Sequence, residues 1–283
     1  MQAIPSSTSS SVTDQDLIDR PRTDFAGLET GAAFAPVSPV DIEASGVSKK
    51  FGSTKIFADV SFRLARGESV ALVGANGAGK STLLRCLMGL IPVTAGRVTI
   101  LGTSCATAMP SEMRKLRSRI GLVSQKHNLV PRLSVLSNVV QGLLGRNPGI
   151  RHWSHSLAPA ESRDRAINAL NKVGLSDLAM RRADRLSGGQ SQRVAIARAI
   201  VGEPEILFAD EPCASLDPSA GEDVMELFFD LARQQGVTVV FTSHNIDHAL
   251  RYGDRILGLA NAGLELDATA TSLNEADLRG LYD

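Results

Sequence analysis

The sequence predicts an α/β protein with a mainly parallel core sheet, and three observations lead to this prediction. Short apolar runs, typical of strands buried on both faces, recur at 68–74, 119–125, 205–210 and 237–243. Segments with the apolar spacing of helices lie between these runs. A glycine-rich stretch joins the first run to the helical segment after it, and strands alternating with helices in this way form parallel sheets.

The elements of the first half follow from local patterns. Alternation of apolar and polar residues begins near Asp41, so the folded domain is expected to start there with strands. The run at 68–74 ends in glycine and predicts a buried strand. The segment at 80–90 has helical spacing, and Pro92 lies just beyond it. The segment at 96–102 is another strand candidate.

The second half contains a helical stretch between two strand-bearing regions. Residues 131–180 are expected to be mainly helical, within an insert that covers about 126–185. Breaks are expected at Gly145, Pro148 and Pro159. A strong amphipathic helix is predicted at 190–201, followed by the buried strands already named.

Composition excludes several classes of protein. The 283 residues carry 30 Lys and Arg against 30 Asp and Glu, and only 4% are aromatic, which argues against a nucleic-acid partner. Cys86, Cys105 and Cys213 lie far apart in the sequence, so neither a zinc site nor a disulfide framework is expected. This use of cysteine predicts a protein of a reducing compartment. The sequence has no apolar run long enough to span a membrane.

The first forty residues differ from the rest. Residues 1–40 are rich in Ser, Thr, Asp, Pro and Gly and lack sustained apolar periodicity, so a mostly disordered extension is expected there. They also lack a basic stretch followed by an apolar segment, so no secretory signal is expected. The folded domain is therefore assigned to 41–283.

A phosphate-binding loop is predicted between the strand at 68–74 and the helix after it. The stretch reads Gly74, Ala75, Asn76, Gly77, Ala78, Gly79, Lys80, Ser81 and Thr82, and its first eight residues fit the pattern GxxxxGK[ST]. Glycines let backbone N–H groups turn toward phosphate oxygens, and the helix N-terminus adds partial positive charge. Lys80 can reach the β- and γ-phosphates, and the Ser81 hydroxyl can bind Mg²⁺.

An acidic pair follows the apolar run at 205–210. Asp210 ends that run and is expected to lie beside the phosphate loop, where a carboxylate would hold Mg²⁺. Glu211 is expected to point elsewhere, because adjacent side chains on a strand alternate. It is therefore the candidate general base that accepts a proton from attacking water.

A second glycine-rich stretch also opens a helix. Its residues are Leu186, Ser187, Gly188, Gly189 and Gln190. A helix start with a capping residue and glycines is an anion site, yet the phosphates are already wrapped by the first loop. We therefore predict that this stretch binds the nucleotide held by another copy of the chain, in a head-to-tail dimer.

With these motifs in this order, residues 41–260 resemble the ATP-binding cassette (ABC) family. The resemblance implies a P-loop NTPase fold with an antiparallel β subdomain and a helical subdomain, and ATP and Mg²⁺ as cofactors. It implies that Phe51 stacks on adenine, that Gln125 contacts metal and water, and that His244 contacts the γ-phosphate. It identifies the second glycine stretch as the family signature. The D-loop is then formed by Ser215, Leu216 and Asp217.

Within the family, the stretch 128–146 resembles the phosphonate-import ATP-binding subfamily. The matches are Asn128, Leu129, Val130, Arg132 to Leu136, Asn138, Val139, Leu144, Gly145 and Arg146, and the segment 244–259 and the ending "LNEADLRGLYD" are also similar. Thr242-Ser243 and Ala75-Asn76 depart from the subfamily's usual residues.

The resemblance implies a working assembly. Two cassettes would join two transmembrane permease subunits at the cytoplasmic face of the cell membrane, with a periplasmic or lipid-anchored solute-binding protein acting through the permease. The alternatives are import of phosphate, phosphite or amino acids, or an ABC ATPase outside transport. Chromosome-maintenance ATPases are disfavoured because no long coiled-coil or zinc insert is present, and twin-cassette translation factors because only one motif set is.

Overall fold

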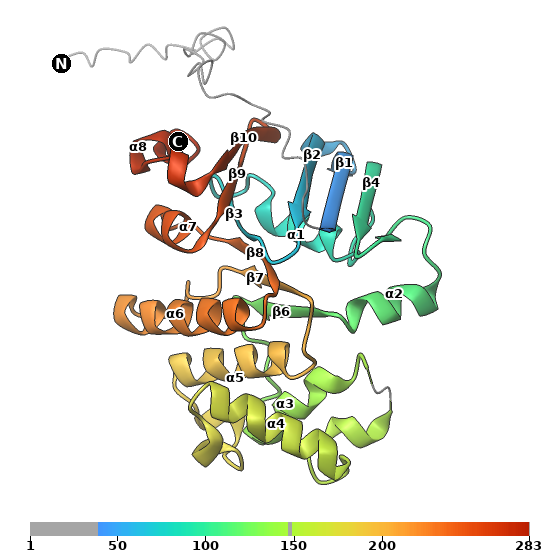
Figure 1. Ribbon diagram of the computed structural model, residues 1–283, viewed down its shortest axis with the longest axis vertical. Coiled ribbons are helices and arrows are strands. Elements are labelled where there is room, and N and C mark those ends of the chain that lie inside the picture. The colour runs from blue at the N-terminus through green and yellow to red at the C-terminus, as the bar shows by residue number, and fades with distance from the viewer. Residues whose placement is uncertain (1–38, 147–148, 283) are drawn as a thin grey trace, which may run out of the picture. The chain divides into compact units, whose positions relative to one another are not determined.

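The structure, a computed structural model, describes residues 39–146 and 149–282, whose strands form two sheets (Figure 1). The extension expected at 1–40 lies outside the described residues except for its last two positions. The expected break at Pro148 also lies outside them.

The larger sheet has the strand order β10-β9-β3-β8-β7-β6. Its neighbouring pairs are parallel except for β10 with β9, which is antiparallel. Every residue of β3 and β8 is buried, as expected for apolar runs covered on both faces. The prediction of a mainly parallel core sheet is thus confirmed. The strands are β3 (Ser69–Val73), β6 (Ile120–Ser124), β7 (Ile206–Asp210), β8 (Thr238–Thr242), β9 (Arg255–Ala260) and β10 (Gly263–Thr269).

The second sheet is antiparallel, with the order β2-β1-β4-β5. Its strands are β1 (Val40–Phe51), β2 (Thr54–Ala65), β4 (Ala95–Ile100) and β5 (Thr103–Ser104). Along β2, Val60, Phe62 and Leu64 are buried and the residues between them are exposed, because one face packs on the core. The strand expected at 96–102 belongs to this sheet, which is the expected antiparallel subdomain.

Helix α1 (Lys80–Leu87) links the two sheets. Leu87 of α1 lies in one apolar cluster with Ile42 and Phe57 of the antiparallel sheet and Phe208 of the core sheet. The helix starts after the loop that follows β3, so this packing fixes the position of the predicted phosphate loop. It ends three residues before the predicted boundary because Gly89 has a φ of +62°.

The other helices include a helical subdomain. Helices α3, α4 and α5 pack on one another, and Figure 1 shows them together beyond α6. Helix α3 runs into a 3₁₀ turn, η1, before Gly145, and α4 starts after Pro159, at two of the predicted breaks. None of the helices among the described residues could cross a bilayer. The helices are α2 (Pro110–Arg117), α3 (Val135–Val140), α4 (Ala160–Lys172), α5 (Gly188–Ile200), α6 (Pro218–Gln234), α7 (Ile246–Tyr252) and α8 (Glu275–Arg279), with 3₁₀ turns η1 (Gln141–Leu143), η2 (Ile150–Trp153), η3 (Ser176–Leu178), η4 (Ala183–Arg185) and η5 (Ala270–Ser272).

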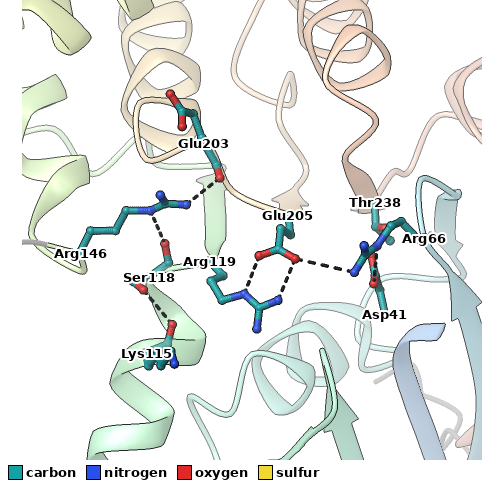
Figure 2. Close-up of polar contacts among 9 residues, drawn as sticks. All are labelled: Asp41, Arg66, Lys115, Ser118, Arg119, Arg146, Glu203, Glu205 and Thr238. Carbon is teal, nitrogen blue, oxygen red and sulfur yellow. Dashed lines mark hydrogen bonds and ion pairs between the residues drawn. The ribbon is translucent and has the colours of Figure 1, made fainter. Parts of the chain in front are cut away.

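Ion pairs connect the elements at the amino edge of the core sheet, the side on which its parallel strands begin (Figure 2). Arg119, just before β6, donates from Nε and Nη2 to the two carboxylate oxygens of Glu205 at 2.5 and 2.7 Å. Arg66 lies 3.8 Å from the same carboxylate and donates to Asp41 at 3.2 Å. The Asp41 side chain is 1% exposed and also accepts a bond from the Thr238 hydroxyl at 2.7 Å. These contacts join β1 to the starts of β6, β7 and β8.

Arg146 connects the helical subdomain to the same region (Figure 2). Its guanidinium donates to the backbone carbonyl of Glu203 at 2.9 Å and to that of Ser118 at 3.3 Å. Two backbone segments that precede core strands are therefore bound to one side chain of the helical subdomain.

Candidate nucleotide-binding site

The predicted phosphate loop connects β3 to α1, and its glycines are required by the backbone. Gly74, Gly77 and Gly79 have φ values of +139°, +86° and +101°. A Cβ on Gly74 would lie 2.2 Å from the carbonyl oxygen of Leu259. Among the described residues no side chain caps α1, so its first N–H groups face the loop without a side-chain acceptor. The loop therefore has the form of an anion cradle.

Lys80 lies folded across this loop. Its Nζ donates to the carbonyl oxygens of Gly74 at 2.7 Å and Ala75 at 3.0 Å. Burial lowers the pKa of Lys80, whereas the carboxylates of Glu211 and Asp210 oppose that change. The ammonium is thus held in the loop by backbone dipoles, facing the acidic pair.

Asp210 lies beside the phosphate loop, as the sequence predicts. Its Oδ1 accepts bonds from the Ser81 hydroxyl at 2.8 Å and the Thr242 hydroxyl at 2.9 Å. Thr242 is a contributor that the sequence reasoning missed. The signal was available, because Thr242 ends the apolar run of β8 and pairs in register with Asp210.

Glu211 points away from Asp210, but strand alternation is the wrong reason. Strand β7 ends at Asp210, and Glu211 has a φ of +49°, in the left-handed region. Its backbone N–H donates to the Thr242 hydroxyl at 2.9 Å. The Glu211 Oε2 atom lies 3.8 Å from Nδ1 of His244, so these two predicted catalytic side chains are neighbours.

Gln125 and Phe51 lie at strand ends and are exposed. Gln125 follows β6, whose last residue, Ser124, pairs with Asp210. Gln125 therefore lies one residue beyond the pair formed by Ser124 and Asp210, where β6 and β7 end. Phe51 ends β1 with 52% of its surface exposed, and the Lys49 ammonium lies 4.6 Å from its ring centroid.

The signature stretch forms the start of α5. Ser187 caps this helix, and Ser187 and Gln190 bond reciprocally at 3.1 and 3.2 Å. Leu186 is half-buried and precedes the cap. Figure 1 places α5 beside α3 and α4, away from α1. The structure therefore does not bring the two glycine-rich stretches of one chain together.

The predicted D-loop runs from the acidic pair to α6. Asp217 caps that helix by accepting a bond from the Ala220 N–H at 3.0 Å, whereas Ser215 is exposed. Leu216 is half-buried, and a Cβ on Gly188 would lie 3.2 Å from its Cδ2. The D-loop and the signature helix of one chain thus touch each other.

A cavity of about 220 Å³ lies beside Glu211 and His244 and extends behind the D-loop. His248 lines it, with Nε2 2.6 Å from Oε1 of Glu222 and Nδ1 3.6 Å from Sγ of Cys213. His248 is buried. Burial raises the pKa of Cys213 to about 11, so its thiol is protonated at neutral pH.

Comparison with known proteins agrees with this geometry. A family model described as "ABC transporter" matches residues 57–214. The chain therefore belongs to the ABC transporter family, and it is an ATP-binding cassette of the ATPase type. The fold and the family predicted from the sequence are both confirmed.

Its relatives include proteins with named cargoes. "Phosphonates import ATP-binding protein PhnC 2" of Pseudomonas savastanoi pv. phaseolicola is 45% identical over 248 residues, which are 85% of this chain and 88% of that protein. "Phosphate-import ATP-binding protein PhnC" of Mycolicibacterium smegmatis is 45% identical over 249 residues, which are 87% of this chain and 94% of that protein.

Solved structures resemble the same region. The dimeric structure of a post-hydrolysis state of the ATP-binding cassette MJ0796 bound to ADP and Pi has a TM-score of 0.70 and 35% identity. It covers 81% of this chain and 98% of that one. The cassette cbiO1 from Clostridium perfringens, part of the transporter complex cbiONQ, has a TM-score of 0.72 and 29% identity, covering 82% of this chain and 90% of that one.

Proposed function

We propose that this chain powers the import of phosphonates by binding and hydrolysing ATP. The supporting observation is the 45% identity to a phosphonate-import ATP-binding protein over 85% of the chain. The subfamily pattern at 128–146 lies inside the helical subdomain, the part of the cassette expected to meet the permease.

The proposed roles follow from the positions of the side chains. Backbone N–H groups of the phosphate loop and Lys80 bind the phosphates. Glu211 accepts the proton of attacking water, and His244, 3.8 Å from that carboxylate, steadies the γ-phosphate. Phe51 offers an exposed ring for adenine, and the Lys49 ammonium over that ring leaves its other face for stacking.

The residues at the phosphate loop also suit a magnesium ion. The Ser81 hydroxyl, the Asp210 carboxylate and the Gln125 amide supply the oxygen ligands that Mg²⁺ prefers. Ser81 and Asp210 already meet at 2.8 Å. When bound, Mg²⁺ neutralises charge on the phosphates. We propose that these three residues hold it.

We further propose a homodimer with two sandwiched nucleotides. The signature helix α5 lies away from its own α1, so its first turn is available to a nucleotide on a second copy. The related cassette MJ0796 has been solved as a dimer bound to ADP and Pi, which supports this arrangement. Two permease subunits and a solute-binding protein complete the proposed importer, at the cytoplasmic face of the membrane.

Phosphate is the second candidate cargo. The relative from Mycolicibacterium smegmatis is a phosphate importer by name and is also 45% identical, so identity does not separate the two oxyanions. The cassette itself does not contact the cargo, which the permease and binding protein select.

A growth test separates these cargoes. A strain lacking this chain should not grow on methylphosphonate as sole phosphorus source, and the wild-type chain should restore growth. The Glu211→Gln variant should not restore it, and growth on phosphate should be unaffected. Loss of growth on limiting phosphate, with normal growth on methylphosphonate, would instead assign the transporter to phosphate.

A further inference from the structure

Residues 281–282 lie against the start of the phosphate loop. The Ala75 N–H donates to the backbone carbonyl of Leu281 at 2.9 Å. Leu281 is 2% exposed, and a Cβ on Gly258 of β9 would lie 2.5 Å from its Cδ1. Leu281 is therefore seated on the core sheet, in a space that exists because residue 258 is glycine.

Tyr282 extends from this position to a second loop. Its hydroxyl donates to the backbone carbonyl of Ser243 at 3.1 Å. Burial raises the pKa of Tyr282 to about 12, and a hydrogen bond with the Gly74 backbone partly opposes that rise. This segment thus contacts the phosphate loop through the Leu281 carbonyl and the residue that precedes His244 through the Tyr282 hydroxyl.

The segment that carries these residues is held by its own capping and packing contacts. Helix α8 begins with a capping box, in which Asn274 accepts bonds from its first turn and Asp277 bonds back to the Asn274 N–H at 2.8 Å. Leu278 is fully buried, and α8 packs on α7. The position of Leu281 and Tyr282 is therefore set by packing around α8.

We propose that Leu281 and Tyr282 form a brace that sets the phosphate loop and the His244 loop in register for ATP hydrolysis. The Gly74 and Ala75 carbonyls hold the Lys80 ammonium, and the Ala75 N–H that donates to Leu281 belongs to the same peptide unit as the Gly74 carbonyl. Ser243 precedes His244, so fixing its carbonyl fixes the start of the second loop. Tyr282 is a positioning residue, because it acts through Lys80 and His244.

This inference rests on the proposed ATP hydrolysis, and it makes a specific kinetic prediction. Tyr282→Phe keeps the ring and removes only the hydroxyl that bonds to the Ser243 carbonyl. We expect kcat for ATP hydrolysis to fall about 3- to 10-fold, the size of effect that one lost hydrogen bond produces. KM for ATP should stay within about twofold, because the groups proposed to bind ATP are unchanged.

The chain offers a matched control in its other tyrosine. The Tyr252 hydroxyl lies 3.4 Å from Oε2 of Glu222, away from the phosphate loop. Tyr252→Phe also removes one tyrosine hydroxyl from a packed region, and its kcat should equal that of the wild type. Thermal unfolding of both variants confirms that each is folded.

A second variant tests the brace from its seat. Gly258→Ala places a methyl group against Leu281 and should lower kcat in the same way, provided that unfolding curves show a folded protein. The proposal is overturned if Tyr282→Phe hydrolyses ATP at the wild-type rate, if it changes only KM or stability, or if Tyr252→Phe loses as much. A wild-type protein without ATPase activity would refute the proposed function instead, so the two failures are distinguishable.

Discussion

Charged residues have different partners at the two edges of the core sheet, the amino edge where its parallel strands begin and the carboxyl edge where they end. At the amino edge, Arg119 and Glu205 pair through two hydrogen bonds, and Asp41 accepts bonds from Arg66 and Thr238. At the carboxyl edge, Lys80 donates to backbone carbonyls, Asp210 accepts from two hydroxyl groups, and Glu211 lies 3.8 Å from His244.

This difference indicates that the amino edge contributes mainly to stability and the carboxyl edge mainly to ligand binding and catalysis. Charges that satisfy one another have little capacity left for a ligand, so the amino edge holds the subdomains together. Charges held by neutral groups remain available to a phosphate, a metal ion or a water molecule. Changes at the carboxyl edge should therefore alter turnover and binding, and changes at the amino edge should alter the free energy of unfolding.

The largest effect is expected at Glu211. Glu211→Gln keeps the size of the side chain and removes the proposed base, so the rate of ATP hydrolysis should fall about 100-fold or more while ATP still binds. Steady-state phosphate release and equilibrium ATP binding measure the two properties. Glu226→Gln, at an exposed position of α6, should leave both unchanged. Near-normal turnover of Glu211→Gln would remove the base from this position.

Loss of the phosphate-loop cation should come next. Lys80→Ala removes charge-assisted hydrogen bonds worth about 1.5–3 kcal/mol each, so ATP affinity should weaken roughly 10- to 100-fold. Titration with ATP, followed by calorimetry, measures this change. The exposed Lys115 serves as the control, and Lys115→Ala should bind ATP normally. Equal affinities for the wild type and Lys80→Ala would contradict the role given to Lys80.

At the amino edge, Asp41 should matter for stability alone. Asp41→Ala removes a buried carboxylate and leaves Arg66 and Thr238 without their acceptor, at a cost of about 2–4 kcal/mol. The melting temperature should fall by roughly 5–10 °C, and kcat at 20 °C should stay within about twofold. On the same strand, Glu43 forms an exposed pair with Arg63, and Glu43→Ala should cost less than about 1 kcal/mol. A catalytic defect in a folded Asp41→Ala protein would break the division between the edges.

The smallest effect is the pH dependence contributed by Glu205. Hydrogen bonding to Arg119 lowers the pKa of this carboxyl below its ordinary value of 4.5 in the folded protein. The ionised Glu205 therefore contributes its full stabilisation of the folded protein above the pKa that it has in the unfolded chain. This contribution is lost as pH falls through the lower pKa that it has in the folded protein. Because the pair is partly exposed, the loss should be under about 1 kcal/mol. Denaturant unfolding between pH 6 and pH 3 should show a smaller decrease for Glu205→Gln, and an identical decrease would exclude this pair as a source.

Local patterns predicted most of the core but not its margins. The runs at 205–210 and 237–243 became β7 and β8 within one residue, because a strand buried on both faces must be apolar throughout. Helix α6, with 17 residues, was not assigned, although Asp217 and Pro218 form a helix start. Strands β9 and β10 were also not assigned; β10 lies at the edge of the sheet and only one of its seven residues is buried, so its sequence gives a weaker signal.

The site was predictable by residue and less so by geometry. The motifs located Lys80, Asp210 and Glu211 because each motif lies where a predicted strand ends or a predicted helix begins. The left-handed backbone of Glu211 depends on the tertiary contact of its N–H with Thr242, which no local pattern encodes. The bond from Tyr282 to Ser243 spans 39 residues of sequence and is set by the packing of α8. Long-range contacts of this kind require the fold itself.

The contact of Leu216 with Gly188 has a consequence for timing between two copies. Under the proposed pairing, a nucleotide on the partner that displaced the start of α5 would also displace Leu216, in the loop that leads back to Glu211 of the same chain. Each chain would then respond, at the carboxylate proposed as its general base, to the binding of ATP by its neighbour. The rate of ATP hydrolysis should therefore rise more steeply than in proportion to the ATP concentration, with a Hill coefficient above one.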